Sequence, residues 1–232
     1  MIKIHDRDLR GRTKTGWLDS YHTYSFAGFQ DPDRMGFRSL RVLNDDIVIP
    51  GAGFPMHGHA NMEIVTYILN GALEHKDSTG NSGVIQPGEL QRMTAGSGIE
   101  HSEFNHSKEN QVHLLQLWFY PEEKGLTPSY EQVAIPAPSN DDHFVVIADR
   151  KGTNGIATIH QDIKIVHGKL KDGETTDYKI APGRGVFLQV THGGIVLNGE
   201  HLKEGDGAEI EDIDLFTLKA SHDAEVLLFD MA

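Results

Sequence analysis

Two short pairs of side chains, each with one residue between its members, are the part of this sequence best suited to metal chemistry. His57 and His59 form the first pair, and His101 and Glu103 form the second. Because side chains alternate between the two faces of a β-strand, each pair would point both members to one side. Three imidazoles and one carboxylate suit a single Fe(II), Mn, Ni, Cu, Co or Zn ion. An octahedral ion would keep two positions open for water, substrate or dioxygen.

The first pair carries little weight by itself. With 14 histidines among 232 residues, chance supplies about 0.8 His-x-His pairs, so two surface histidines would be the simpler interpretation. Pro55 and Gly58 disfavour a helix, which argues against a helical zinc site made from His59 and Glu63. The second pair repeats the spacing about forty residues later. The sequence therefore predicts one mononuclear site with ligands from two strands.

The chain around these pairs has the pattern of an all-β protein. Short runs rich in Val, Ile, Leu and aromatic residues alternate with turns that contain Gly and Pro. Strands are expected over residues 63–69, 111–120, 144–148, 185–190 and 224–229. No long segment has a helical period, so a sandwich or barrel of many short strands is expected.

Residues 128–142 divide the chain into two halves. They include three prolines and few core-like residues, which is typical of an extended linker. Residues 64–71 are weakly similar to residues 186–193, which indicates a repeated design. We therefore expect an N-terminal barrel over residues 1–130 and a C-terminal barrel over residues 131–232.

Composition excludes several classes of function. The formal net charge of −13 disfavours direct nucleic-acid binding, because such a surface repels phosphates. The chain has no cysteine, so thiolate metal sites and cysteine nucleophiles are impossible. No apolar run reaches about 18 residues, so no membrane span is expected. Charged residues stand near the N-terminus where a secretion signal needs an apolar run, and a cytoplasmic location is expected.

Longer motifs carry a resemblance to a known family. The pattern Gly51-x5-His57-x-His59-x3-Glu63 is similar to the first cupin motif, and Pro87-Gly88 followed by His101-x3-Asn105 resembles the second in outline. Residues 16–26, 62–67 and 98–105 resemble the pirin family, and most closely its bacterial members described as quercetin 2,3-dioxygenases. The resemblance is strong to about Tyr130 and weak to Ala232. It implies a bicupin, two jelly-roll barrels, with metal in the N-terminal barrel only and with His57, His59, His101 and Glu103 as ligands.

Two details extend this expectation. Glu63 shares the strand parity of His57 and His59, and we expect it either to support the ligands from beside the site or to have a structural role, with Glu103 as the carboxylate ligand. In the C-terminal half, the positions corresponding to the four ligands fall near Lys179, Ala181, Leu215 and Thr217. No ligand set is recoverable there, so the second barrel is expected to bind no metal.

Two functions fit these residues. The first is an enzyme, with Fe(II) as the expected metal, that opens the ring of a flavonol such as quercetin with dioxygen and releases carbon monoxide. Glu103 would be its general base for the 3-hydroxyl proton. The second is a regulatory protein without turnover that senses metal or redox state and acts through protein partners. A vestigial metal-binding barrel is a third interpretation.

The remaining polar residues are given structural roles. The segment with His22 is expected to be a strand that packs on the barrel. Either His113 or Gln116 is expected to line the metal pocket, since they lie on opposite faces of one strand. Histidines without a partner at useful spacing are expected on the surface or in turns, namely His75, His106, His160, His167, His192, His201 and His222.

Overall fold

The computed structural model describes residues 1–136 and 142–232. Within them the chain forms β-strands and two short 3-10 helices, so the expected all-β class is confirmed. None of the described residues forms a helix long and apolar enough to cross a membrane. The chain divides into two compact units. We call Gly11–Ile135 with Arg150–Gln161 the N-terminal unit, and Met1–Arg10, Pro136–Asp149 and Asp162–Ala232 the C-terminal unit.

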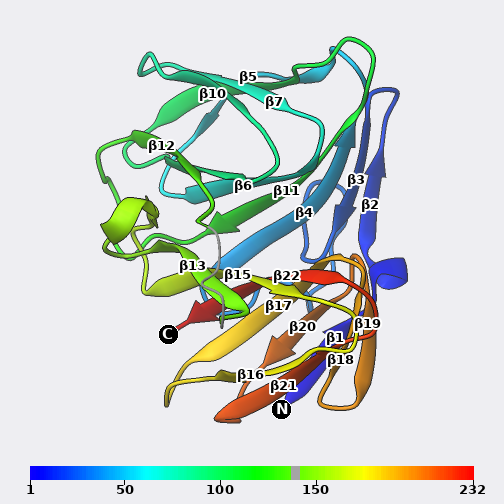
Figure 1. Cartoon of the computed structure of the whole chain (residues 1–232). Coiled ribbons are helices and arrows are strands. Elements are labelled where there is room, and N and C mark those ends of the chain that lie inside the picture. Colours follow the sequence, from blue (N-terminus) through cyan, green and yellow to red (C-terminus); the bar gives the residue numbers. More distant parts are fainter. Residues whose placement is uncertain (137–141) are drawn as a thin grey trace. The chain divides into compact units, whose positions relative to one another are not determined.

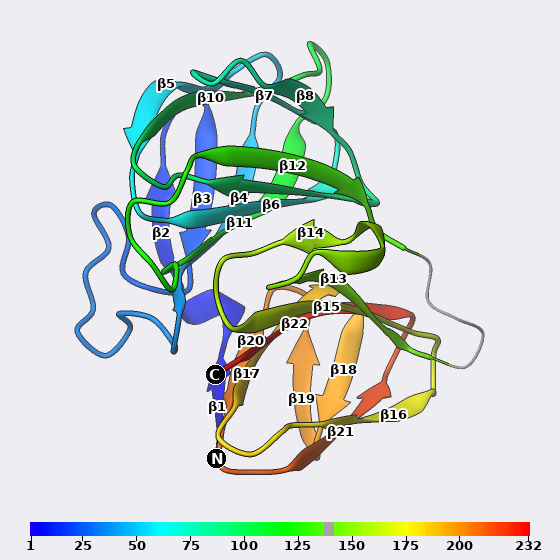
Figure 2. The ribbon, with the colours of Figure 1, turned by 90° about the vertical axis from the view of Figure 1, so that its left-hand side faces the viewer.

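The N-terminal unit consists of two antiparallel sheets that face each other (Figures 1 and 2). The larger has the order β12-β9-β6-β11-β4-β3-β2, and the smaller has the order β5-β10-β7-β8. Its strands are β2 (Gly11–Lys14), β3 (Leu18–His22), β4 (Leu40–Val48), β5 (Gly53–His59), β6 (Glu63–Asn70), β7 (Leu73–Asp77), β8 (Ser82–Ile85), β9 (Glu89–Thr94), β10 (Ile99–Asn105), β11 (Val112–Phe119), β12 (Ser129–Ala134) and β14 (Ala157–Thr158), with the 3-10 helix η2 (Thr153–Gly155).

Apolar and polar side chains take separate levels inside this unit. One apolar cluster includes Ile68 and Leu114, which pair across β6 and β11. Ile64 belongs to a second apolar cluster, and Trp118, its partner across the same two strands, packs against that cluster. Thr66 and Gln116 pair at the level between them. This polar level faces β10 of the smaller sheet, where Gln116 and Thr66 contact Glu103.

The C-terminal unit repeats the two-sheet design. One sheet contains β1-β20-β17-β22-β15-β13 in this order, and the other has the order β16-β21-β18-β19. The elements are β1 (Ile2–His5), the 3-10 helix η1 (Arg7–Leu9), β13 (Phe144–Asp149), β15 (Ile163–Leu170), β16 (Thr175–Lys179), β17 (Gly185–His192), β18 (Gly194–Leu197), β19 (Glu200–Lys203), β20 (Gly207–Ile210), β21 (Leu215–Ala220) and β22 (Ala224–Met231).

Its interior is filled by apolar side chains. Strand β16 pairs with β21, as β5 pairs with β10 in the other unit. The buried residues of β21 are Phe216, Leu218 and Ala220, all part of one apolar cluster. Dispersion and burial of apolar surface therefore hold this barrel together.

Three segments differ from the ranges expected from sequence. Strand β1 pairs with β20, so residues 1–10 belong to the C-terminal unit, while residues 150–161 belong to the N-terminal unit. The expected linker, residues 128–142, contains β12, which pairs with β9 at the sheet edge. Prolines lie just before and after this strand, where no ladder hydrogen bond is lost. Residues 137–141 of the expected linker lie outside the described residues. The domain ranges themselves stay a prediction.

Candidate metal centre

Three of the four predicted ligands gather around one point. His57 and His59 come from β5, and His101 comes from β10, where it pairs directly with His57. The ring centroids are 4.5 Å apart for His57 and His101, 4.8 Å for His57 and His59, and 4.9 Å for His59 and His101. One ring nitrogen from each lies within 4.8 Å of the others. His101 is buried, and the other two are half-buried, so the cluster has one open side.

The hydrogen bonds of these rings leave ligand nitrogens available. Nδ1 of His57 lies 2.8 Å from the carbonyl oxygen of Pro55, and because a carbonyl only accepts, Nδ1 carries the hydrogen. Its Nε2 then keeps a lone pair. Nε2 of His101 is buried without a hydrogen-bond partner among the described residues. A buried polar atom of this kind needs a partner, and a metal ion would supply one.

The protonation states also suit a metal. Burial and the nearby imidazoles of His57 and His75 together lower the pKa of His101 to about 3. Burial and the rings of His101 and His57 lower the pKa of His59 to about 4. Both imidazoles are therefore neutral at pH 7. Neutral imidazole is the form that binds metal ions.

Glu103 lies on the buried side of the cluster. Its Oε2 accepts a 2.8 Å hydrogen bond from Nε2 of Gln116, and its Oε1 accepts a 3.5 Å hydrogen bond from Oγ1 of Thr66. Its carboxylate is grouped within 4.8 Å with His101 and His75, whereas His57 and His59 are grouped with His101. Its role as a metal ligand stays a prediction.

The backbone of β5 and β10 is irregular beside this carboxylate. The pairing register shifts between His101 and Glu103, because a bulge interrupts the ladder. A Cβ atom at Gly53 would lie 2.2 Å from the carbonyl oxygen of Glu103, so only glycine lets the two strands approach this closely. The donor set of three imidazoles and one carboxylate fits a divalent transition metal.

The structure decides between His113 and Gln116. Gln116 lies on the interior face of β11 and contacts Glu103, so it lines the candidate centre. His113 lies on the opposite face, with Nε2 2.6 Å from Oδ1 of Asp45. His22 lies in strand β3 as expected, where its Nδ1 is 2.8 Å from Oδ1 of Asn44.

Of the two roles expected for Glu63, its contacts favour the structural one. Asn61 adopts a left-handed conformation with φ of 54°, which turns the chain between β5 and β6 and ends the strand parity shared with His57 and His59. The buried Glu63 instead accepts a 3.1 Å hydrogen bond at Oε2 from the backbone N–H of His160. It therefore fastens residues 150–161 to the N-terminal unit.

Two histidines expected at the surface or in turns are instead buried on strands. His167 is 4% exposed and contacts Glu225, and His75 is fully buried next to His101. The signal for His75 is present in the sequence, since His75 and Asp77 are a third pair with one residue between its members, on β7. That spacing places both on the interior face of a strand neighbouring His101.

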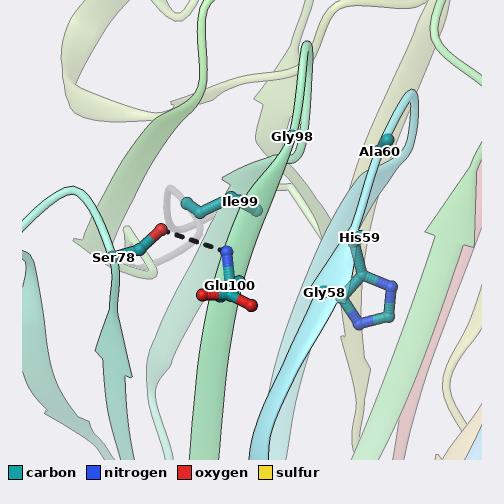
Figure 3. Close-up of a pocket in the computed structure, with 7 residues that line it drawn as sticks. All are labelled: Gly58, His59, Ala60, Ser78, Gly98, Ile99 and Glu100. Atoms are coloured by element: carbon teal, nitrogen blue, oxygen red, sulfur yellow. Dashed lines mark hydrogen bonds between the residues drawn. The ribbon is translucent and has the colours of Figure 1, made fainter.

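Aromatic side chains flank the open side of the cluster. Phe54 lies next to His57, and Trp118 packs edge-on against His59 with centroids 4.8 Å apart. A shallow hollow of about 420 Å³ lies on the outer face of the paired strands β5 and β10, and the ring of His59 points away from its other lining residues (Figure 3). Its other lining residues are Gly58, Ala60, Ser78, Gly98, Ile99 and Glu100.

Known proteins resemble this chain over its whole length. Residues 4–119 match the family model described as Pirin, and residues 146–231 match the model described as Quercetinase C-terminal cupin domain. A protein of Escherichia coli K12 named quercetin 2,3-dioxygenase is 43% identical over 100% of this chain and 99% of its own length. A pirin-like protein of Caulobacter vibrioides is 38% identical over 100% of both chains.

A solved structure gives the same result for the fold. The crystal structure of the bacterial pirin YhhW from Escherichia coli, in complex with nickel(II), superposes with a TM-score of 0.94. It is 41% identical, and the match covers 100% of this chain and 99% of that one. The expected bicupin architecture is therefore confirmed, and the chain belongs to the pirin family.

Proposed function

We propose that this protein is a metal-dependent quercetin 2,3-dioxygenase, which opens the central ring of a flavonol with dioxygen and releases carbon monoxide. The observation that carries the proposal is the cluster of His57, His59 and His101. The imidazoles of His59 and His101 are neutral at pH 7, and the cluster is open on one side. Full-length relatives named for this activity support it.

The proposed metal is a single divalent ion held by His57, His59, His101 and Glu103. Fe(II) is the proposed native ion, and Mn, Ni, Cu, Co or Zn would fit the same donors. The nickel(II) complex of the related pirin supports a metal of this class. When bound, such an ion supplies Lewis acidity toward the flavonol oxygens and an electron path to dioxygen.

The protein's own residues are proposed to bind and deprotonate the substrate. Glu103 is the proposed general base for the 3-hydroxyl group. Gln116 holds Oε2 at 2.8 Å, whereas Thr66 holds Oε1 only at 3.5 Å, so Oε1 is the oxygen better placed to accept a proton. Phe54 and Trp118 would flank a flat aromatic ligand and limit water at the open side.

The test is turnover by protein loaded with one metal at a time. Oxygen uptake and carbon monoxide release are measured with quercetin, for Fe(II), Mn, Ni, Cu and Co. Equal amounts of oxygen consumed and carbon monoxide formed with at least one metal, and loss of both in His59→Ala, are expected. Tight metal binding without quercetin-dependent oxygen uptake in any metal form would contradict the enzyme and favour the regulatory alternative.

A cytoplasmic location and protein partners complete the proposal. The absence of cysteine suits a reducing compartment. Pull-down from a host extract with metal-free and metal-loaded protein tests for partners. A partner that binds both forms equally would show that the metal plays no part in its recognition.

A further inference from the structure

Behind the candidate metal centre, three buried side chains form a line that ends at a predicted ligand. Oδ2 of Asp77 lies 3.3 Å from Nε2 of His75, and Nδ1 of His75 lies 3.5 Å from Nδ1 of His101. The side chains of His75 and Asp77 are both 0% exposed, and His101 is 1% exposed. Water therefore does not compete for these contacts.

Only one set of hydrogen positions satisfies this line with neutral imidazoles. Asp77 is ionised and can only accept, so Nε2 of His75 carries the hydrogen. Nδ1 of His75 is then an acceptor, which requires the hydrogen of His101 to be on Nδ1. Nε2 of His101 is left with its lone pair, and this is the buried atom without a hydrogen-bond partner among the described residues.

Other contacts keep the line in place. Burial alone would raise the pKa of Asp77, but hydrogen bonds from Thr79, Asn81 and His75 outweigh it and lower the pKa. The ring of His75 stacks on Tyr130, with centroids 4.8 Å apart and planes 27° apart. Strands β7 and β10 pair His101 with Asp77 and Glu103 with His75, so the ladder fixes the spacing.

We propose that His75 and Asp77 are positioning residues, which hold the imidazole of His101 in the tautomer that turns Nε2 to the metal. The inference rests on the metal centre of the proposed function. Carboxylate–imidazole partners behind metal ligands fix ring orientation and strengthen binding. Here the carboxylate acts through a second imidazole rather than directly.

The test uses cobalt(II) binding, followed by its visible ligand-field absorption, and does not depend on turnover. His75→Phe keeps an aromatic ring on Tyr130 but removes the acceptor for His101. We expect its cobalt affinity to fall about 10- to 100-fold, the range for loss of such a partner, with a shifted spectrum. His75→Gln supplies an amide oxygen as acceptor and is expected to recover most of the affinity.

Asp77→Asn is the sharper variant. It keeps the Oδ1 atom that accepts from Thr79 and the backbone of Asn81, and it loses the 3.1 Å hydrogen bond that Oδ2 accepts from Nδ2 of Asn81. Its amide nitrogen faces His75 as a donor and favours the opposite tautomer in both rings. We expect a loss of cobalt affinity comparable to that of His75→Phe. His113→Phe, whose histidine also pairs with a carboxylate but on the opposite face of β11, is the matched control with unchanged affinity.

Two results would overturn the proposal. One is unchanged cobalt affinity and spectrum in His75→Phe and Asp77→Asn, with circular dichroism and melting like the parent protein. The other is a histidine count, from X-ray absorption of the cobalt form, that falls from four to three in His75→Phe, since His75 would then be a ligand itself. If cobalt binds as expected but quercetin is not turned over, the proposed activity fails and the positioning role stands.

Discussion

Gln116 on β11 donates a 2.8 Å hydrogen bond from Nε2 to Oε2 of Glu103 on β10, and so joins the two sheets of the N-terminal unit across their interior. Both side chains are buried, at 7% and 2% exposure. The contact orients the carboxylate on the side of His101. Because this hydrogen bond joins the two sheets, the position of Glu103, the candidate base and ligand, is coupled to the stability of the barrel.

Replacing Gln116 with Met, which has similar volume and no strong donor, tests this contact. A buried carboxylate oxygen would lose its partner, so we expect the free energy of unfolding of metal-free protein to fall by about 1–3 kcal/mol. Urea unfolding measures it. In Glu103→Gln the loss on adding Gln116→Met should be smaller, and equal losses in both backgrounds would show that the two side chains are not coupled.

The predicted ligands should differ from other histidines in metal retention. Substitution of His57, His59 or His101 with Ala should leave protein that loses its metal on dialysis, because each removes one donor. His192→Ala, at an exposed position in the C-terminal unit, should retain it. Metal content per chain, determined by elemental analysis, makes the comparison. Full retention of the metal in all three variants would show that the cluster is not the binding site.

The lowered pKa of His101 predicts acid sensitivity in metal-free protein. The folded pKa of about 3 lies below the ordinary value of 6.5, so the unfolded chain binds the proton first. The stability of the folded state that depends on neutral His101 is present above pH 6.5 and is lost as the pH falls toward 3. Between pH 7 and pH 4, the unfolding free energy of the parent should therefore fall more than that of His101→Gln. A difference that does not change with pH would contradict this assignment.

Asp46 should show the opposite sign. Burial raises its pKa to about 7, with the charges of Asp45 and Glu103 adding to the effect against a hydrogen bond from Ser20. Ionising this buried carboxyl destabilises the fold as the pH rises above the ordinary value of about 3.8. Asp46→Asn should therefore stabilise the metal-free protein more at pH 8 than at pH 4, as measured by urea unfolding at the two values. An equal effect at both would show that Asp46 ionises freely.

Glu63 should matter for stability and not for metal. Glu63→Leu leaves the backbone N–H of His160 without its carboxylate acceptor, and a loss of about 1–3 kcal/mol in unfolding free energy is expected. Glu63→Gln keeps an acceptor oxygen and should lose less. Cobalt affinity should be unchanged in both. A weaker cobalt affinity in Glu63→Gln would show that Glu63 does act on the metal centre.

The sequence allows the ligand-bearing strands to be predicted because their signal is local. Strand alternation places His101 and Glu103 on one buried face, as the pattern of β10 shows. The same reasoning fails for Glu63, because a single left-handed residue, Asn61, separates two strands that look continuous in sequence.

Non-local pairing accounts for what sequence could not supply. Strand β1 belongs to the C-terminal unit because it pairs with β20, which lies about 200 residues away in the sequence. The residues of β1 themselves do not indicate this partner. His75 lies next to His101 only because β7 pairs with β10. The i, i+2 pair of His75 and Asp77 is visible in sequence, but its position behind the candidate metal centre is not.

The most direct test of the account is anomalous diffraction from crystals of metal-loaded protein, recorded at the absorption edge of the metal. We predict one fully occupied peak per chain, bonded to His57, His59, Nε2 of His101 and Glu103. A peak bonded instead to His75, His101 and Glu103, or no peak between β5 and β10, would contradict it.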